Sequence, residues 1–568
     1  MLRDPVALPG AAPPLAAPRA ESLARSWAAR VLLVLASALV AWRAYRLWAP
    51  ELVMDDAFIL FRYARNLADG FGPVFNAGER VEGYVTFLWV GLLALGRRLG
   101  FELGDVAVVL SFAATAATLW VLHLLGRRLF AEDGPAGAWK ALVAPLLYAT
   151  MANPARYVGS GMETNLVVLL SLAGLTLWLS GERRWAGLVF ALATLTRPEM
   201  VLFFGLLMAY ELLAGGGAWR ERLRRAAVPA AVFAAVGVPY FLWRLQYFGY
   251  LLPNPFYVKV GSGGPELWVR GAKLLLQALR ESSLEAPLAL ALVGLVAGRR
   301  RPLMRLLGAW ILLAAAYFIA VGGDFLYLFG PRFLMPAVPV VLLLAAEGLG
   351  RLVGWLPRWG ARARPALAAL VLVALAANAW LWSWPVSRRA DLRMVAAIQR
   401  GWIEVGKWLA AHSPPEAVLA VQPAGAIPYF ADRVTIDMFG LSDLHIAHQS
   451  LPVGKGSAGH EKYDTAYVLS REPDFLVFMR LDAKGQPVLA DWPRFGREIE
   501  AKYQLVALAR GTPRPEPLPW VVEAGEVTAE RLKTGYLVPI YRRRTAPGGD
   551  AAAGAATGAP GGTPHHEP

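Results

Sequence analysis

Long apolar runs separated by short polar loops dominate the chain between residues 31 and 384. A helix needs about 20 residues to cross a bilayer, and apolar runs of roughly 12 to 20 residues recur in this region. We therefore expect about 11 membrane-spanning helices. They cover residues 31–49, 105–126, 138–152, 164–180, 185–197, 199–214, 227–245, 285–298, 303–321, 333–350 and 366–384. This pattern predicts a mainly α-helical fold, a polytopic transmembrane bundle.

Arginine clusters occupy alternate loops between these runs. They are Arg127 and Arg128, Arg183 and Arg184, Arg220 to Arg225, Arg299 to Arg305, and Arg351 to Arg364. Because basic loops stay on the cytoplasmic side, we expect these clusters and the N-terminus in the cytoplasm. The loops left for the outer side are 50–104, 151–164, 196–199, 246–259 and 322–333. They are rich in glycine, proline and aromatic residues and carry isolated charges, which indicates that the active side is outside.

Two apolar runs need a separate interpretation. The run at 84–98 ends in Arg97 and Arg98. If it crossed the membrane, every later arginine cluster would lie on the outer side. We therefore predict a helix at the outer interface there. The first run could also belong to a signal peptide, but no small-residue cleavage site follows it, which favours an uncleaved span.

The character of the chain changes after Trp384. Short apolar runs at 418–422, 475–479 and 503–509 alternate with helical stretches, which predicts a small extracytoplasmic α/β domain. The predicted organisation has four parts. They are a disordered cytoplasmic N-terminus (1–26), a transmembrane catalytic domain (27–385), the α/β domain (386–544) and a disordered tail (545–568).

Composition agrees with an integral membrane protein, since 56% of the 568 residues are hydrophobic and 17% are charged. The net charge of +15 follows from the loop arginines, so it sets topology and does not indicate a nucleic-acid partner. The chain has no cysteine, which excludes thiol nucleophiles and thiolate metal sites. Abundant arginine, alanine, leucine and glycine suggest a GC-rich bacterial genome, and hence the bacterial plasma membrane.

The stretch from Met54 to Trp89 follows the first span and is too polar to be a plain connector. Asp55 and Asp56 open a predicted amphipathic helix. A carboxylate before a helix most often caps the free N–H groups of the first turn. Adjacent helical residues diverge by about 100°, so one carboxylate can cap while the other faces a cavity as a general base. Asp55 is better placed to cap, which favours Asp56 as the catalytic base.

A polar stripe follows on the same helix, formed by Arg62, Arg65, Asn66 and Asp69. It is either the polar face of an ordinary interfacial helix or a site where guanidinium groups bind a phosphate. Polar and aromatic residues continue after it and are further candidates for substrate binding: Asn76, Glu79, Glu82, Tyr84 and Trp89.

The other outer loops contribute isolated polar and charged residues. One is Glu163. Asn254 and Lys259 belong to the motif LPNPFYVK, and Asp324 and Arg332 belong to GGDFLYLFGPRF. Arg197 and Glu199 interrupt an apolar run, where they are either a structural pair or part of a functional site. A lipid phosphate at the outer surface would need one or two of these cations.

Histidines near the C-terminus form a loose set with two aspartates. The set is His445, His448 and His460 with Asp437 and Asp443. Its spacing matches no metal template, so we predict no metal and no cofactor, and leave a divalent metal open. The chain also carries no P-loop, dinucleotide fingerprint or zinc-protease motif.

Four blocks of sequence resemble one known family. The stretch DDAFILFRYARNLADGFGPVFNAGERVEGYVTFLW resembles the first loop of the mycobacterial terminal β-(1→2)-arabinofuranosyltransferases, within the GT-C class of membrane glycosyltransferases. LPNPFYVK, GGDF with RFLMP, and IDMFGLSDLHIAH with GHEK resemble later signatures of that family. The likeness covers most of residues 30–480.

The resemblance implies a GT-C-like bundle that transfers a sugar, with inversion, from a polyprenyl-phosphate donor to a cell-envelope glycan or glycolipid. It makes Asp55 or Asp56 the base that removes the proton of the acceptor hydroxyl. The donor phosphate would be bound by Arg62, Arg65, Lys259 and Arg332, which stabilise the charge that develops on it. The substrate-binding residues would be Asn66, Asn76, Glu79, Glu82, Tyr84, Trp89, Glu163, Asn254, Asp324 and His445.

Three departures from the family pattern leave the sugar and the acceptor open, so arabinofuranose is an expectation by analogy. Residues 83–87 stand where a Thr-Asn pair is expected, Pro255 replaces a usual threonine, and the insert LYLFGP precedes Arg332.

The alternative function is a transporter or flippase of lipid-linked glycans, but the spans carry few charges and show no related halves. A membrane scaffold that presents the C-terminal domain would leave the outer loops unexplained.

Overall fold

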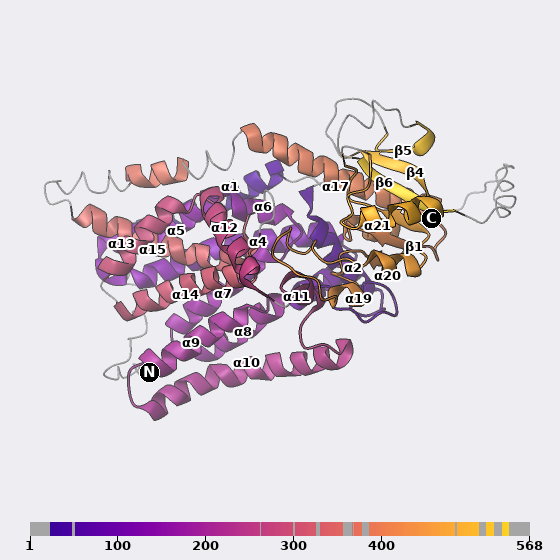
Figure 1. The fold of residues 1–568 in the computed structure, drawn as a ribbon. Coiled ribbons are helices and arrows are strands. Elements are labelled where there is room, and N and C mark those ends of the chain that lie inside the picture. The colour runs from indigo at the N-terminus through magenta and orange to yellow at the C-terminus, as the bar shows by residue number, and fades with distance from the viewer. Residues whose placement is uncertain are drawn as a thin grey trace, which may run out of the picture.

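A helical bundle and a mixed sheet make up the computed structural model (Figure 1). It describes residues 23–47, 52–261, 263–298, 301–324, 330–355, 366, 369–377, 386–482, 485–510, 519–526 and 537–544. The predictions for residues 1–22 and for the tail from 545 therefore lie outside the described residues. Figure 1 shows the bundle at one end, the sheet at the other, and helices α2, α11 and α19 between them.

Helices account for nearly all of the bundle. They are α1 (Leu23–Leu47), α2 (Asp55–Ala68), α3 (Phe87–Arg98), α4 (Leu103–Leu129), α5 (Pro135–Thr150), α6 (Ala152–Gly159), α7 (Thr164–Leu179), α8 (Arg183–Thr196), α9 (Met200–Ala214), α10 (Trp219–Phe248), α11 (Asn254–Lys259), α12 (Pro265–Glu281), α13 (Glu285–Ala297), α14 (Arg301–Ala320) and α15 (Val338–Gly354). Each predicted span up to 333–350 coincides with one of these helices. The span predicted at 366–384 lies mostly outside the described residues.

Five helical segments in the described part of the chain are long and apolar enough to cross a membrane. They are Ser26–Arg46, Leu103–Leu129, Trp219–Phe248, Pro302–Ala320 and Arg332–Gly354. Helices α7, α9 and α13 are apolar but shorter. The chain thus has the helices of a membrane protein, while the number of crossings stays a prediction. Helix α3 is not among the candidate spans, and its position at the interface also stays a prediction.

Small residues allow close packing inside the bundle. Helices α13 and α15 lie against each other, and a Cβ atom on Gly348 would clash with the carbonyl group of Leu290. A Cβ atom on Gly294 would likewise clash with the carbonyl group of Leu344. Glycine at these crossings lets two backbones approach more closely than larger side chains would allow. Helix α10, by contrast, lies along one side of the bundle and is mostly exposed (Figure 1).

The C-terminal region contains a six-stranded sheet in the order β2-β1-β3-β6-β4-β5. Its elements are α17 (Val386–His412), β1 (Val418–Val421), α18 (Ala426–Ala431), β2 (Val434–Asp437), α19 (Leu444–Ala447), α20 (Thr465–Ser470), β3 (Phe475–Val477), α21 (Trp492–Lys502), β4 (Tyr503–Arg510), β5 (Val521–Glu523) and β6 (Leu537–Arg543). Strand β1 pairs in parallel with β2 and β3, and β6 runs antiparallel to β3 and β4. Apolar side chains cover both faces, with Leu419 in one core and Ala420 in the other.

The segments predicted as outer loops meet at the end of the bundle that faces this region. Trp89 Nε1 donates to the Gly161 carbonyl at 3.0 Å, and the Tyr157 hydroxyl donates to Gly330 at 2.8 Å. The backbone N–H of Asn254 donates to the Glu82 carbonyl at 3.0 Å. Loops that are far apart in the sequence therefore build one surface under the C-terminal region.

Candidate active site

The two aspartates at the start of α2 have different partners. The Asp55 carboxylate accepts the backbone N–H groups of Gly425 at 3.0 Å and Ala426 at 2.8 Å, and so caps the start of α18. It does not cap its own helix, whose N-cap is Met54 with no side-chain bond, so that detail of the expectation was wrong. Burial raises the pKa of Asp55 to about 6. The hydrogen bond from the Ala426 amide lowers this pKa in part, and the charge of Asp56 raises it.

Asp56 turns toward a pair of charged residues from the loop before α15. Its Oδ2 atom lies 3.4 Å from a guanidinium nitrogen of Arg332, and its side chain keeps 34% of its area exposed. Arg332 binds Asp324 through two hydrogen bonds of 2.6 and 2.9 Å. Burial alone would raise the pKa of Asp324, but the Arg332 guanidinium outweighs it and holds that pKa below its usual value. Asp56 is therefore the carboxylate that remains open to a ligand.

Lys259, at the end of α11, faces the same space. Within the described residues its ammonium group makes no hydrogen bond and no ion pair, whereas Arg332 is held by Asp324. Burial lowers the pKa of Lys259, and the charge of Asp56 opposes this in part. A cation in this state can bind an anion without first breaking a bond within the protein.

These groups line a cavity of about 1100 Å³ between the bundle and the C-terminal region. The bundle side consists of residues 52–56 and Ile59, Lys259, one face of α12, Asp324 and Arg332. The C-terminal side consists of Val395, Gln399, Trp402, residues 422–424, Asp437, Phe439, Leu441, residues 454–460 and Met479. The cavity thus combines carboxylates, cations and apolar area, as a site for an amphiphilic phosphate requires.

A glycine-containing loop at residues 454–461 closes one side of the cavity. The Glu461 carboxylate accepts the backbone N–H groups of Gly454 at 2.8 Å and Gly456 at 2.6 Å. Arg270 of α12 binds Glu461 at 2.6 Å and also donates to the Gly456 carbonyl at 3.0 Å. The loop is therefore fastened to α12 at the cavity wall, where it also places Lys455 and His460.

Sequence reasoning did not single out the residues that α12 and this loop contribute as cations. Arg270, Lys273 and Lys455 line the cavity, but none was proposed as a site residue. The amphipathic pattern of α12 and the glycines around Lys455 were the available signals. Neither pattern by itself indicates which face of a helix or loop meets a ligand.

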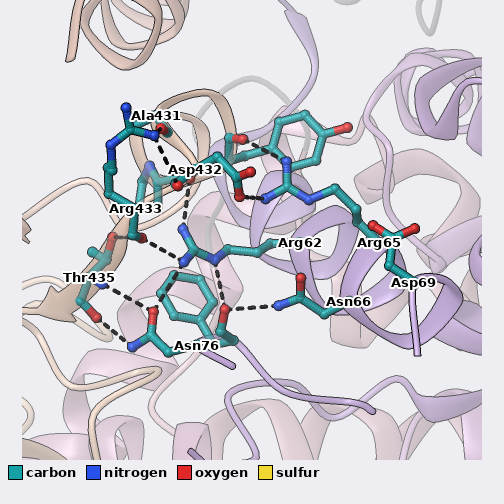
Figure 2. Close-up of polar contacts among 12 residues, drawn as sticks. Arg62, Arg65, Asn66, Asp69, Asn76, Ala431, Asp432, Arg433 and Thr435 are labelled. Carbon is teal, nitrogen blue, oxygen red and sulfur yellow. Dashed lines mark hydrogen bonds and ion pairs between the residues drawn. The ribbon is translucent and has the colours of Figure 1, made fainter. Parts of the chain in front are cut away.

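Arg62 and Arg65 do not line the cavity. Figure 2 shows Arg62 between α2 and the C-terminal region, where its buried guanidinium donates to the carbonyl oxygens of Phe75, Pro428 and Arg433, each at 2.7 Å. Arg65 donates to the Tyr429 carbonyl at 3.1 Å and pairs with Asp432 at 2.6 Å. The interpretation of this stripe as a phosphate site is replaced by one in which both arginines join two parts of the chain.

Asn66 and Asn76 support the same junction. Asn66 donates to the carbonyls of Val74 at 2.8 Å and Phe75 at 3.0 Å. Asn76 exchanges hydrogen bonds with the backbone of Thr435 at 2.9 and 3.0 Å and accepts one from Arg62 at 3.1 Å (Figure 2). Both asparagines therefore hold the first loop rather than face the cavity.

Other predicted substrate-binding residues are also buried outside the cavity wall. Glu82 pairs with Arg244 at 2.5 Å, and burial raises the pKa of Glu82 to about 7 against the effect of that pair. Tyr84 and Trp89 are buried in the core. Asn254 donates to the carbonyls of Gly440 at 2.9 Å and Asp443 at 3.1 Å.

Glu163 lies in a buried charge network next to the site. It binds Arg197 at 3.0 Å, and Arg197 also binds Glu199 at 2.8 Å. The Arg197 guanidinium lies over the ring of Phe333, the residue after Arg332. This network therefore supports the segment that carries Arg332. Of the two interpretations of Arg197 and Glu199, the structure favours the structural pair.

The loose histidine set does not come together. His460 lines the large cavity, whereas His445 and His448 line a separate, smaller hollow together with Glu79. Among the described residues, no group of three histidine, cysteine, aspartate or glutamate side chains is placed to hold a metal ion. Of the aspartates that line the large cavity, Asp56 and Asp324 face Arg332, whereas Asp55 and Asp437 accept backbone N–H groups.

Three comparisons bear on what this site does. Residues 390–536 match a family model described as a domain of unknown function, DUF8728. The terminal beta-(1->2)-arabinofuranosyltransferase of Mycobacterium tuberculosis is 30% identical over 349 residues, which are 53% of this chain and 54% of that protein. The enzyme of the same name from Corynebacterium glutamicum is 29% identical over 59% of this chain and 52% of its own length. The chain thus spans about half the length of these curated relatives.

A solved structure extends the likeness to the fold. The cryo-EM structure of arabinofuranosyltransferase AftD from Mycobacteria superposes with a TM-score of 0.51 and 19% identity. It covers 92% of this chain, which in turn covers 40% of that protein. The chain is therefore similar in sequence to terminal beta-(1->2)-arabinofuranosyltransferases over more than half its length, and similar in fold to a mycobacterial arabinofuranosyltransferase over nearly all of it.

Proposed function

We propose that this chain is a membrane glycosyltransferase that moves a sugar from a polyprenyl-phosphate donor to a cell-envelope glycan or glycolipid. The observation that carries the proposal is the convergence of Asp56, Lys259 and Arg332 on one cavity of about 1100 Å³ beside apolar helices. The names of the two curated relatives support arabinofuranose as the sugar. The basic loops support a plasma-membrane orientation with the N-terminus in the cytoplasm and the cavity outside.

Asp56 is the proposed base of an inverting transfer. It removes the proton of the acceptor hydroxyl as that oxygen attacks the anomeric carbon from the side opposite the phosphate. The bond between the anomeric carbon and the phosphate oxygen breaks, and the phosphate leaves with the electron pair. Because Asp55 already accepts two backbone hydrogen bonds, it serves to position Asp56 rather than to take the proton.

Lys259 and Arg332 are the proposed partners of the donor phosphate. The negative charge on the phosphate grows as the bond breaks, so cations that are already in place lower the barrier. Asp324 fixes the orientation of Arg332 through two hydrogen bonds, while Lys259 is free of partners among the described residues. A phosphate is already a good leaving group, so the second catalytic carboxylate found in glycoside hydrolases is not required.

Helix α12 supplies the proposed surface for the lipid chain. Val269 and Leu274 line the cavity, together with Ile59 of α2 and Trp402 of α17. Leu276 of the same helix is 63% exposed. Apolar side chains near the phosphate-binding cations suit the first isoprenyl units of the donor.

The proposal is tested with the purified chain in vesicles, a polyprenyl-phosphate donor carrying radiolabelled arabinofuranose, and a synthetic arabinofuranose acceptor. We expect labelled product with the opposite anomeric configuration, and release of polyprenyl phosphate in equal amount. Movement of the lipid-linked sugar across the vesicle membrane without labelled product would contradict the proposal and favour a flippase.

A further inference from the structure

A second hollow, of about 530 Å³, opens between the first loop and the C-terminal region. The first loop contributes Glu79, the segment after α10 contributes Tyr250, and α19 and α20 contribute histidine and tyrosine side chains. None of these residues takes part in the reaction proposed for the large cavity. The hollow therefore needs an explanation of its own.

Aromatic rings form two exposed surfaces in this hollow. The His445 ring stacks on Tyr467 with centroids 4.0 Å apart, and the His448 ring lies 4.7 Å from that of Tyr250. The His445 side chain is 45% exposed, and Tyr250 is 38% exposed. Exposed flat rings of this kind offer apolar faces for the C–H groups of a sugar ring.

Polar groups hold the rings of His445 and Tyr467 in fixed positions. Asp464 binds His445 Nε2 at 2.9 Å and Gln449 at 3.1 Å. The Tyr467 hydroxyl donates to Asp443 at 3.1 Å and accepts from Arg471 at 2.9 Å. Rings fixed in this way lose little conformational freedom when a ligand binds.

The charges around the hollow favour a neutral ligand. Glu79 and Asp443 line it with one arginine, Arg471, whose guanidinium is already bound to Tyr467. A phosphate would meet two carboxylates there, in contrast to the cations of the large cavity. Carboxylates and ring faces together suit the hydroxyls and C–H groups of a neutral saccharide.

The two hollows share one segment of the chain. Asp437, Phe439 and Leu441 line the large cavity, and Thr435 and Asp443, at either end of the same segment, line the second hollow. The Asp437 carboxylate accepts the backbone N–H groups of Phe439 at 3.0 Å and Ser442 at 2.8 Å, which keeps this segment in shape. Residues 435–443 therefore contribute to the walls of both hollows.

We infer that the second hollow binds a neutral oligosaccharide, namely the inner sugars of the acceptor chain whose end reaches the large cavity. The acceptor role rests on the proposed function, whereas saccharide binding is a property of the hollow itself. The hollow then sets a preference for long acceptors without taking part in the chemistry.

The test measures binding of two probes to the full chain in nanodiscs with no donor present, by saturation-transfer NMR and calorimetry. The probes are a linear arabinofuranose hexasaccharide and the corresponding disaccharide. We expect the hexasaccharide to bind at least about tenfold more tightly, and His445→Ala and Tyr250→Ala each to remove most of that difference. His412→Ala is the matched control, because His412 also stacks on an aromatic ring, that of Trp408 at 4.3 Å, but does not line the hollow.

Equal binding of both probes, or unchanged hexasaccharide binding in both hollow variants, would overturn the inference. Thermal unfolding of each variant separates loss of binding from loss of folding. Failure of the proposed function has a different outcome. If the wild-type chain transfers no sugar to either probe, the proposed function is wrong, but loss of hexasaccharide binding in His445→Ala still supports saccharide binding in the hollow. Normal transfer with no dependence on acceptor length would leave the function standing and remove the inference.

Discussion

The carboxylate of Asp55 lies 2.8 Å from the backbone nitrogen of Ala426, a residue 371 positions later in the chain. This bond joins the first turn of α2 to the first turn of α18, and so joins the bundle to the C-terminal region. Asp56 is the next residue, so the same bond fixes where the proposed base points. Asp55 therefore stabilises the junction, whereas the Asp56 carboxylate faces the cavity.

The junction at Asp55 predicts a specific dependence of stability on pH. Burial raises the pKa of Asp55 to about 6, above the value in the unfolded chain, so the folded state binds the extra proton between about pH 4 and pH 6. The contribution of this group to stability is present at the low end of that range and is lost as the pH rises through 6. Asp55→Asn removes the titration. We expect the difference in melting temperature between wild type and Asp55→Asn to change across pH 4 to 6 and to be constant above about 7, and parallel curves would contradict this.

Asp324 keeps Arg332 from pairing fully with the proposed base. In Asp324→Asn the guanidinium loses its ionic partner, so we expect it to pair more closely with Asp56 and to make that carboxylate less available as a base. The expected loss of kcat is roughly 10- to 100-fold. Glu199→Gln is the control, since it disrupts the neighbouring buried pair with Arg197 without touching the cavity wall. Equal effects of the two variants on kcat would contradict this role.

Lys259 is expected to act on the donor and not on the acceptor. Lys259→Gln removes a cavity cation that makes no hydrogen bond or ion pair within the described residues, so the donor KM should rise about tenfold while the acceptor KM stays unchanged. Initial rates at varied concentrations of each substrate give the two constants. Lys407→Gln, an exposed lysine paired with Glu404, is the matched control and should change neither. A rise in the acceptor KM alone would place the phosphate elsewhere.

Arg62 should matter for stability and not for donor binding. Arg62→Lys keeps the charge but cannot make the four hydrogen bonds of the guanidinium group, so buried carbonyl oxygens lose their donors. We expect the free energy of unfolding to fall by about 2 kcal/mol or more. Arg65→Lys is the comparison, because the Asp432 side chain that Arg65 binds is exposed, and it should cost less than about 1 kcal/mol. A higher donor KM in folded Arg62→Lys protein would restore the phosphate interpretation.

The helices and the clustering of the outer loops could be predicted from the sequence because each follows from a local rule. Apolar length predicts the helices at the expected spans, and the alternation of arginines predicts which loops share a side. The convergence of Asp56, Lys259 and Arg332 on one cavity agrees with that grouping. Loops on one side of a bundle have few other places to pack.

The partners of individual side chains could not be predicted in the same way. An arginine that binds carbonyl oxygens looks the same in the sequence as one that binds a phosphate, and the difference here depends on where Pro428 and Arg433 fold. Asp55 caps a helix that only tertiary structure brings near. The separation of His460 from His445 likewise depends on the path of the 454–461 loop. Contacts between distant segments carry no local pattern.

The most direct test of the account compares Asp56→Asn with Asp55→Asn under single-turnover conditions, with both variants shown to be folded and to bind the donor. We predict that Asp56→Asn lowers the rate of transfer by at least about a thousandfold with donor affinity nearly unchanged, because the base is lost. Asp55→Asn should retain a measurable rate, since an amide oxygen can still accept one of the two backbone bonds. Transfer by Asp56→Asn at the wild-type rate would contradict the central claim.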